Sequence, residues 1–117
     1  MPSYVPPLSE LQFVLADLLD VPAVLAQMPE CVEVDSALLQ HVLVEAGRFA
    51  RDVLFPLNAP GDREGCRFAA GEVQTPAGFA AAYREFREAG WPALACHPVL
   101  GGQGLPHVLG LAVYAMM

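Results

Sequence analysis

The apolar residues in the first half of the chain recur at the spacing of a helix. The longest such stretch follows Asp35, a residue type that often caps a helix start, and continues to Leu54. Its apolar positions are Leu38, Leu39, Val42, Leu43, Ala46, Phe49, Ala50, Val53 and Leu54. We predict one long helix here that ends at Pro56, because proline lacks the amide hydrogen that continues the ladder.

Two shorter helices are predicted ahead of this one. Ser9 and Gln12 have the spacing of a capping box at the start of the first. Its apolar stripe comprises Leu8, Leu11, Leu15 and Leu18, widened by Phe13, Val14 and Leu19. Pro22 lies near the first position of the second helix, which we expect to run to Met28 and to stop at Pro29.

Turn-forming residues dominate the sequence from Asn58 to Gln74. Within it, the segments 66–69 and 72–74 can pair as a small hairpin. Thr75–Pro76 then has the pattern of a helix start, and Gly90 that of a left-handed helix end. The residues that this helix is expected to turn inward are Phe79, Tyr83 and Phe86.

The closing segment carries no Asp, Glu, Lys or Arg after Glu88. We expect a loop at Pro98–Leu105 and a final helix at Val108–Met117 that is apolar on every side except at Tyr114. A helix of this kind must be buried, and its length is only about half of the roughly 20 residues that cross a membrane. It also ends without a capping residue, so we expect a chain that is truncated inside its last helix.

Composition and charge narrow the function classes. The 117 residues suit one domain, and 13 acidic residues against 6 arginines give a net charge of −7. Such a chain lacks the basic surface that nucleic acid or anionic lipid requires, so we expect no nucleic acid or membrane partner. Three widely spaced cysteines and no signal peptide predict a cytoplasmic protein in which each cysteine is a small buried side chain.

Few residues suggest chemistry of their own. The acidic pairs sit in turns or beside arginines, as solvated residues do, and Cys96–His97 with His107 lacks the spacing of a metal site. The loop Gly101–Gly104 stands before a helix as phosphate-binding loops do, but His107 takes the place of a third glycine, which favours a tight turn. Trp91 is expected to anchor this loop in the core and to need a partner for its indole N–H.

Three segments resemble the acyl-CoA dehydrogenase family. The end of the long helix, Glu45–Asn58, is similar to the family's early helix with its Phe-Ala-Arg run and closing proline. Phe86–Leu94 is similar to a helix end with glutamate, a small residue and glycine, and Pro98–Leu105 to a Gly-Gly-x-Gly-Leu loop. Tyr4–Leu15 resembles a leader found in a branch of the family that acts on long, bulky or sulfur-containing acyl-CoAs, and Leu57–Cys66 resembles that branch's following loop.

The resemblance implies an all-α fold of the amino-terminal type, with leader helices in 1–34 and the family's helical domain in 35–117. It implies an enzyme that dehydrogenates an acyl-CoA thioester with FAD, in which the flavin and the catalytic glutamate are held by domains outside this chain. We therefore expect no catalytic residue and no bound FAD in the chain alone. The final helix also departs from the family, because Ala115 stands where a glutamate is usual.

Substrate contacts by resemblance are assigned to Trp91, Gly101, Gly102, Gly104 and Leu105. The alternative hypothesis is a stand-alone helical interaction module without catalysis. Under either hypothesis the apolar final helix predicts a homo-oligomer, because exposed apolar surface favours association.

Overall fold

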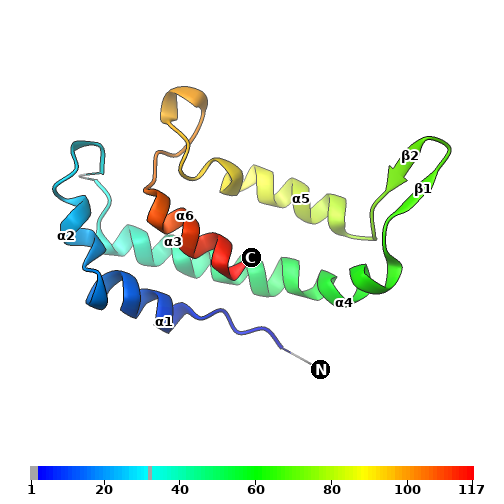
Figure 1. Cartoon of the computed structure of the whole chain (residues 1–117), viewed down its shortest axis with the longest axis horizontal. Coiled ribbons are helices and arrows are strands. Elements are labelled where there is room, and N and C mark those ends of the chain that lie inside the picture. Colours follow the sequence, from blue (N-terminus) through cyan, green and yellow to red (C-terminus); the bar gives the residue numbers. More distant parts are fainter. Residues whose placement is uncertain (1–2, 32) are drawn as a thin grey trace.

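The computed structural model describes residues 3–31 and 33–117, and their fold is all-α with one small hairpin, as predicted (Figure 1). The order of elements is α1 (Leu8–Gln12), a π-helical turn (Phe13–Leu18), α2 (Val21–Leu25), a 3₁₀ turn (Pro29–Cys31), α3 (Ser36–Phe49), a second π-helical turn (Ala50–Leu54), α4 (Phe55–Glu64), β1 (Arg67–Ala69), β2 (Glu72–Gln74), α5 (Phe79–Glu88), two 3₁₀ turns (Trp91–Ala93 and Pro98–Leu100) and α6 (His107–Met116).

The long helix does not end at Pro56, which corrects the prediction. From Ser36 to Glu64 the chain is helical throughout, because α3, the π-helical turn and α4 follow one another without a break. At the junction the amide of Phe55 donates to the carbonyl of Ala50, five residues back. This wider turn accommodates the ring of Pro56, and both Pro56 and Pro60 lie on the exposed side where water can satisfy unpaired carbonyls.

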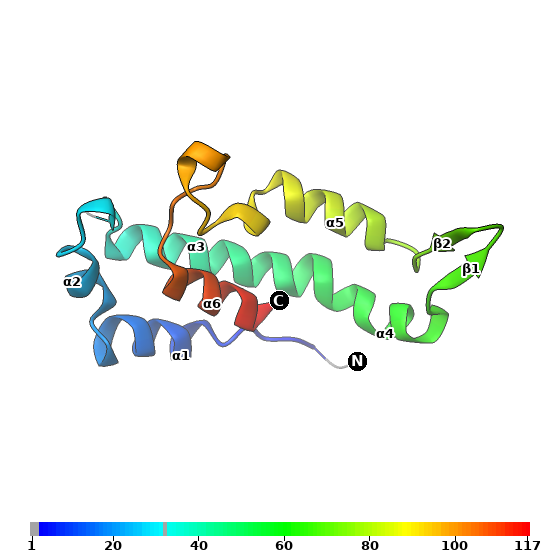
Figure 2. The same cartoon turned by 45° about the horizontal axis from the view of Figure 1, so that its top comes forward.

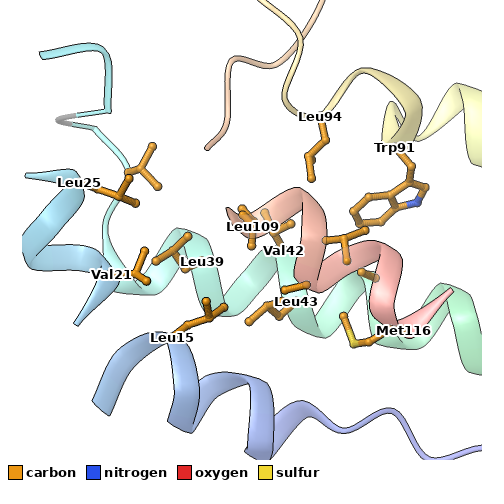
Figure 3. Close-up of a cluster of buried hydrophobic side chains, with 14 of the residues drawn as sticks. Leu15, Val21, Leu25, Leu39, Val42, Leu43, Trp91, Leu94, Leu109 and Met116 are labelled. Atoms are coloured by element: carbon orange, nitrogen blue, oxygen red, sulfur yellow. The ribbon is translucent and has the colours of Figure 1, made fainter. Parts of the chain in front are cut away.

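The core lies between α3 and α6, which pack side by side (Figure 2). Asp35 caps α3 as predicted, since its carboxylate accepts a hydrogen bond of 2.8 Å from the amide of Leu38. Leu43 on α3 lies near Leu109 on α6 (Figure 3), and these two side chains and that of Val113 are almost wholly buried. The remaining core residues are Leu15, Val21, Leu25, Cys31, Val34, Leu39, Val42, Ala46, Phe49, Ala50, Trp91, Leu94, Ala112 and Met116.

The leader packs along α3 next to α6. A Cβ on Gly47 would lie 3.2 Å from both Pro6 Cβ and Leu8 Cδ2, so the missing side chain of Gly47 allows the leader to approach closely. The predicted capping box is wrong, because α1 begins at Leu8 and the hydroxyl of Ser9 donates to Glu10 instead. Only part of the stripe is buried: Leu15 is in the core, whereas Phe13, Val14, Leu18 and Leu19 are exposed.

The second leader helix and the hairpin are where the sequence placed them. The helix α2 starts one residue earlier than predicted and passes into turns before Pro29. In the hairpin, Phe68 pairs with Val73, and every strand residue is exposed. The turn places Ala70 at φ 53° and Gly71 at φ 80°, and the hairpin extends beyond the end of α4 (Figure 1).

Helix α5 begins later and buries less than predicted. Its first residue is Phe79, preceded by Gly78 in the left-handed region, so Thr75–Pro76 is not its start. The amide of Ala77 instead hydrogen-bonds the Glu64 carboxylate, which ties this turn to the end of α4. The helix ends as predicted at Gly90, with φ 82°.

The final helix is buried on one face only. Leu109, Ala112, Val113 and Met116 are buried, but Leu111 is 72% and Tyr114 is 53% exposed, so the expectation of a helix buried on all sides is not met within this chain. The hydroxyl of Tyr4 donates a hydrogen bond of 2.8 Å to the carbonyl of Met116. One carbonyl at the end of α6 is therefore satisfied by the leader, a contact that the sequence did not suggest.

The molecule is thin, which explains the exposed apolar faces. Its extents are 54 × 38 × 16 Å, so in the shortest direction it is little thicker than one helix with its side chains. The radius of gyration is 16.9 Å, whereas a compact domain of this length has about 13 Å. The exposed surface is 7905 Å², roughly 1,700 Å² more than a compact monomer of this mass exposes.

Candidate functional site

Trp91 occupies the junction between α5 and the 3₁₀ turn that follows it. The left-handed Gly90 turns the chain there, and the indole packs into the core with its ring centroid 6.4 Å from that of Phe49. The side chain is only 8% exposed, so it anchors this segment as predicted. Its nitrogen, however, has no hydrogen-bond partner among the described residues. A buried donor without a partner is uncommon, because it has lost its bond to water.

The loop Gly101–Gly104 folds back on the segment after Trp91. The amides of Gly102 and Gly104 donate to the carbonyls of His97 and Cys96, and the amide of Gln103 donates to Ala93. A Cβ on Gly102 would lie 2.0 Å from the Cys96 oxygen. These glycines therefore serve a tight turn, which agrees with the interpretation favoured by the sequence.

A cleft runs beside Trp91 between α3 and the segments that follow α5. It consists of two adjoining hollows that share Glu45, Ala89 and Trp91. The first, of about 410 Å³, is lined by Leu38, His41, Val42, Glu45, Ala89, Trp91, Leu94, Gln103 and Leu105. The second, of about 300 Å³, is lined by Glu45, Arg48, Phe49, Asp52, Val53, Glu85, Ala89 and Trp91. We call them the leucine hollow and the acidic hollow.

The structure brings together two of the five predicted substrate-binding residues. Trp91 and Leu105 both line the leucine hollow, whereas Gly101, Gly102 and Gly104 do not. The sequence missed the residues of α3 that form the opposite wall, because their polar members look like ordinary solvated side chains. His41, one of these residues, is exposed. Gln103 was also missed, and its amide donates to the Gly90 carbonyl at 3.1 Å.

Charges at the acidic hollow are partly paired. Arg48 forms an ion pair with Glu45, and Arg51 donates two hydrogen bonds to Asp52 at 2.7 and 2.9 Å. The hydrogen bond from Arg51 lowers the pKa of Asp52, and the same bond raises the pKa of Arg51. Three carboxylates and one guanidinium line this hollow, so it favours the binding of a positively charged group over that of a negatively charged one.

A second concave surface is apolar. The aromatic residues of α5 were expected to face the core, but Phe79 is 38% and Tyr83 is 61% exposed, and Ala82 is the buried residue of this helix. They face an open groove of about 350 Å³, which we call the aromatic groove. Its lining is Leu54, Leu57, Asn58, Phe79, Ala82, Tyr83, Phe86, Tyr114 and Met117. The molecule is too thin for another layer of helices to cover this face.

The loop Gly101–Gly104 does not fit the pyrophosphate of FAD. A flavin dinucleotide needs backbone amides free to bind its pyrophosphate, but the amides from Gly101 to Gly104 all donate within the loop.

Other candidate features are also accounted for. No group of three His, Cys, Asp or Glu side chains comes together in residues 3–31 and 33–117. Cys66 and Cys96 are exposed, although buried cysteines were expected. None of the helices described is both long and apolar enough to cross a membrane.

No protein-family model matches the chain. It is, however, 37% identical over 111 residues to 3-methylmercaptopropionyl-CoA dehydrogenase of Ruegeria pomeroyi. Nearly the whole chain is therefore similar to one segment of an acyl-CoA dehydrogenase. The match covers 94% of this chain but 18% of the Ruegeria enzyme. The family resemblance and the all-α fold predicted from the sequence are thereby confirmed, and FAD is the cofactor that the family implies for a complete enzyme.

The structure shows where Ala115 lies on the final helix. Ala115, at which the resemblance implied a glutamate, lies on the exposed side of α6 beside Tyr114. A side chain at this position therefore does not enter the core of the chain.

Proposed function

We propose that the chain works as one structural part of a longer acyl-CoA dehydrogenase, which removes two hydrogens across the α,β bond of an acyl-CoA thioester. The sequence match over nearly the whole chain carries this proposal. The match spans only 18% of the Ruegeria enzyme, which supports the role of one part among several. FAD and the catalytic base are accordingly assigned to segments outside these 117 residues, and the cytoplasmic location remains a prediction.

Contact with the acyl-CoA remains a prediction for five residues. Trp91 and Leu105 can form an apolar wall, since both line the leucine hollow. The turn uses the backbone amides of Gly101, Gly102 and Gly104 for its own hydrogen bonds, and it leaves no room for a side chain at Gly102. These glycines would therefore act by holding Leu105 in place.

A chimera tests the proposed function directly. The 111 matched residues of this chain replace their counterparts in the Ruegeria enzyme, and acyl-CoA oxidation is followed with an artificial electron acceptor. We expect an enzyme that binds FAD and retains activity. A soluble, folded chimera without activity would contradict the proposal. The isolated chain should purify without flavin absorbance, and stoichiometric FAD in it would show that the flavin site lies within these 117 residues after all.

The exposed apolar surface favours a second function, that of a self-associating helical module. Tyr114 on α6 lines the aromatic groove, and Leu111 on the same helix is 72% exposed. The excess exposed surface of roughly 1,700 Å² is more than the ~800 Å² that each partner buries in a standard interface. We expect the isolated chain to form dimers or larger species in light scattering. A monomer that persists at high concentration would count against this second function.

A further inference from the structure

The indole N–H of Trp91 is buried, unpartnered among the described residues and next to the acidic hollow. Figure 3 shows the nitrogen on the edge of the ring that faces away from Leu94 and Leu109, toward the side on which α5 lies. The acidic hollow lies on that side, since its lining includes Glu85 of α5 together with Trp91. The geometry thus combines an open volume of about 300 Å³ with a donor that no described residue satisfies.

We propose that the acidic hollow binds a short extended segment of the same enzyme polypeptide, from outside these 117 residues, that gives a backbone carbonyl to Trp91 and a basic side chain to Glu85. This inference rests on the proposed function. An extended segment fits better than a helix because its carbonyls are free to accept, whereas those of a helix are used internally.

The size and the charge of the acidic hollow restrict the length and the charge of the segment that can bind there. The wall from Glu45 to Val53 corresponds to about 12 Å of helix. Three or four extended residues cover this length at roughly 3.4 Å each. Glu45 and Asp52 already have arginine partners, whereas Glu85 forms no ion pair with any described residue. A lysine or arginine in the incoming segment would therefore be directed to Glu85.

Under the proposed function, the rest of the enzyme supplies the occupant. The Ruegeria relative devotes 18% of its length to the matched region, so more than four fifths of that enzyme can supply the segment. The nitrogen itself is shielded from water in the present structure. Neighbouring side chains must therefore move before a carbonyl reaches it.

The isolated chain allows a first test, because Trp91 is its single tryptophan. Its indole N–H gives one signal in a ¹⁵N–¹H correlation spectrum. We expect that signal at the position of an indole without a hydrogen bond, and we expect Glu85→Gln and Glu45→Gln to leave it there. A hydrogen-bonded signal that moves in either variant would show that a carboxylate of this chain already satisfies the donor, and would overturn the inference.

The chimera allows a second test. A photo-crosslinking residue replaces Glu85 at the hollow or, as a control, Glu72 on the exposed hairpin. From position 85 we expect crosslinks to a short segment of the Ruegeria portion that contains Lys or Arg, and none of these from position 72. Crosslinks confined to the 117 residues, or made to another polypeptide, would overturn the inference.

A third measurement separates the hydrogen bond from simple packing. Trp91→Phe keeps an aromatic ring but removes the donor, so the active chimera should lose stability, with its folded-to-unfolded ratio reduced about five-fold. The isolated chain should lose less than the chimera, because it has no acceptor to lose. Equal effects in both proteins would contradict the proposed bond. An active chimera that lacks the expected crosslink would contradict this inference alone. A folded chimera without activity would contradict the proposed function.

Discussion

Replacing Gly47 with leucine tests whether the leader is held by close packing on α3. A Cβ at this position would already lie 3.2 Å from Pro6 and from Leu8, and the rest of the leucine side chain needs space that these residues occupy. A glycine replaced by leucine in a helix interior gains about 0.5–1 kcal/mol of helix propensity. Overpacking in a fitted core costs about 1–3 kcal/mol. From the midpoints of these two ranges we therefore expect a net destabilisation of about 1 kcal/mol.

The assay is urea unfolding followed by the fluorescence of Trp91, with Gly110→Ala as the matched control. Gly110 is also buried within a helix, but a Cβ there meets only the Ala95 Cβ, at 3.9 Å. This control should stabilise the chain by about 0.5–1 kcal/mol through propensity alone. Shortening the leader contact with Leu8→Ala should recover part of the loss in Gly47→Leu. If Gly47→Leu proved as stable as the native chain, the close contact between the leader and α3 would be refuted.

Three further predictions concern single contacts. Tyr4→Phe keeps the ring stacked on Phe55 but removes the bond to the end of α6, so unfolding free energy should fall by about 0.5–1.5 kcal/mol; an unchanged urea midpoint would argue against that bond. Ala70→Gly should stabilise the hairpin by about 1 kcal/mol, since φ is 53° there, which amide exchange of the strand residues can measure. The lowered pKa of Asp52 means that its pairing with Arg51 adds stability above the usual carboxyl pKa and loses it as the pH falls through the lowered value. The contribution is small because both groups are exposed to solvent, and Arg51→Gln should flatten this part of the pH profile.

Local patterns in the sequence were enough for the elements whose signals act over a few residues. The cap at Asp35, the hairpin and the left-handed end at Gly90 are each set by one side chain or one backbone conformation, and the structure has them where they were predicted. The family was also readable, because short motifs retain their order along the chain. The end of the long helix was misread at Pro56, since a wider turn before it absorbs the ring.

Only the tertiary structure decided which apolar residues are buried and what surrounds Trp91. Periodicity identifies a helix face, but burial requires a second element to cover that face, and the 16 Å slab leaves Tyr83 and Leu111 uncovered. The bond from Tyr4 to Met116 joins residues 112 positions apart, a separation at which no local pattern operates. The cleft at Trp91 likewise arises where α3 meets the end of α5, so its walls could be found only once the chain was folded.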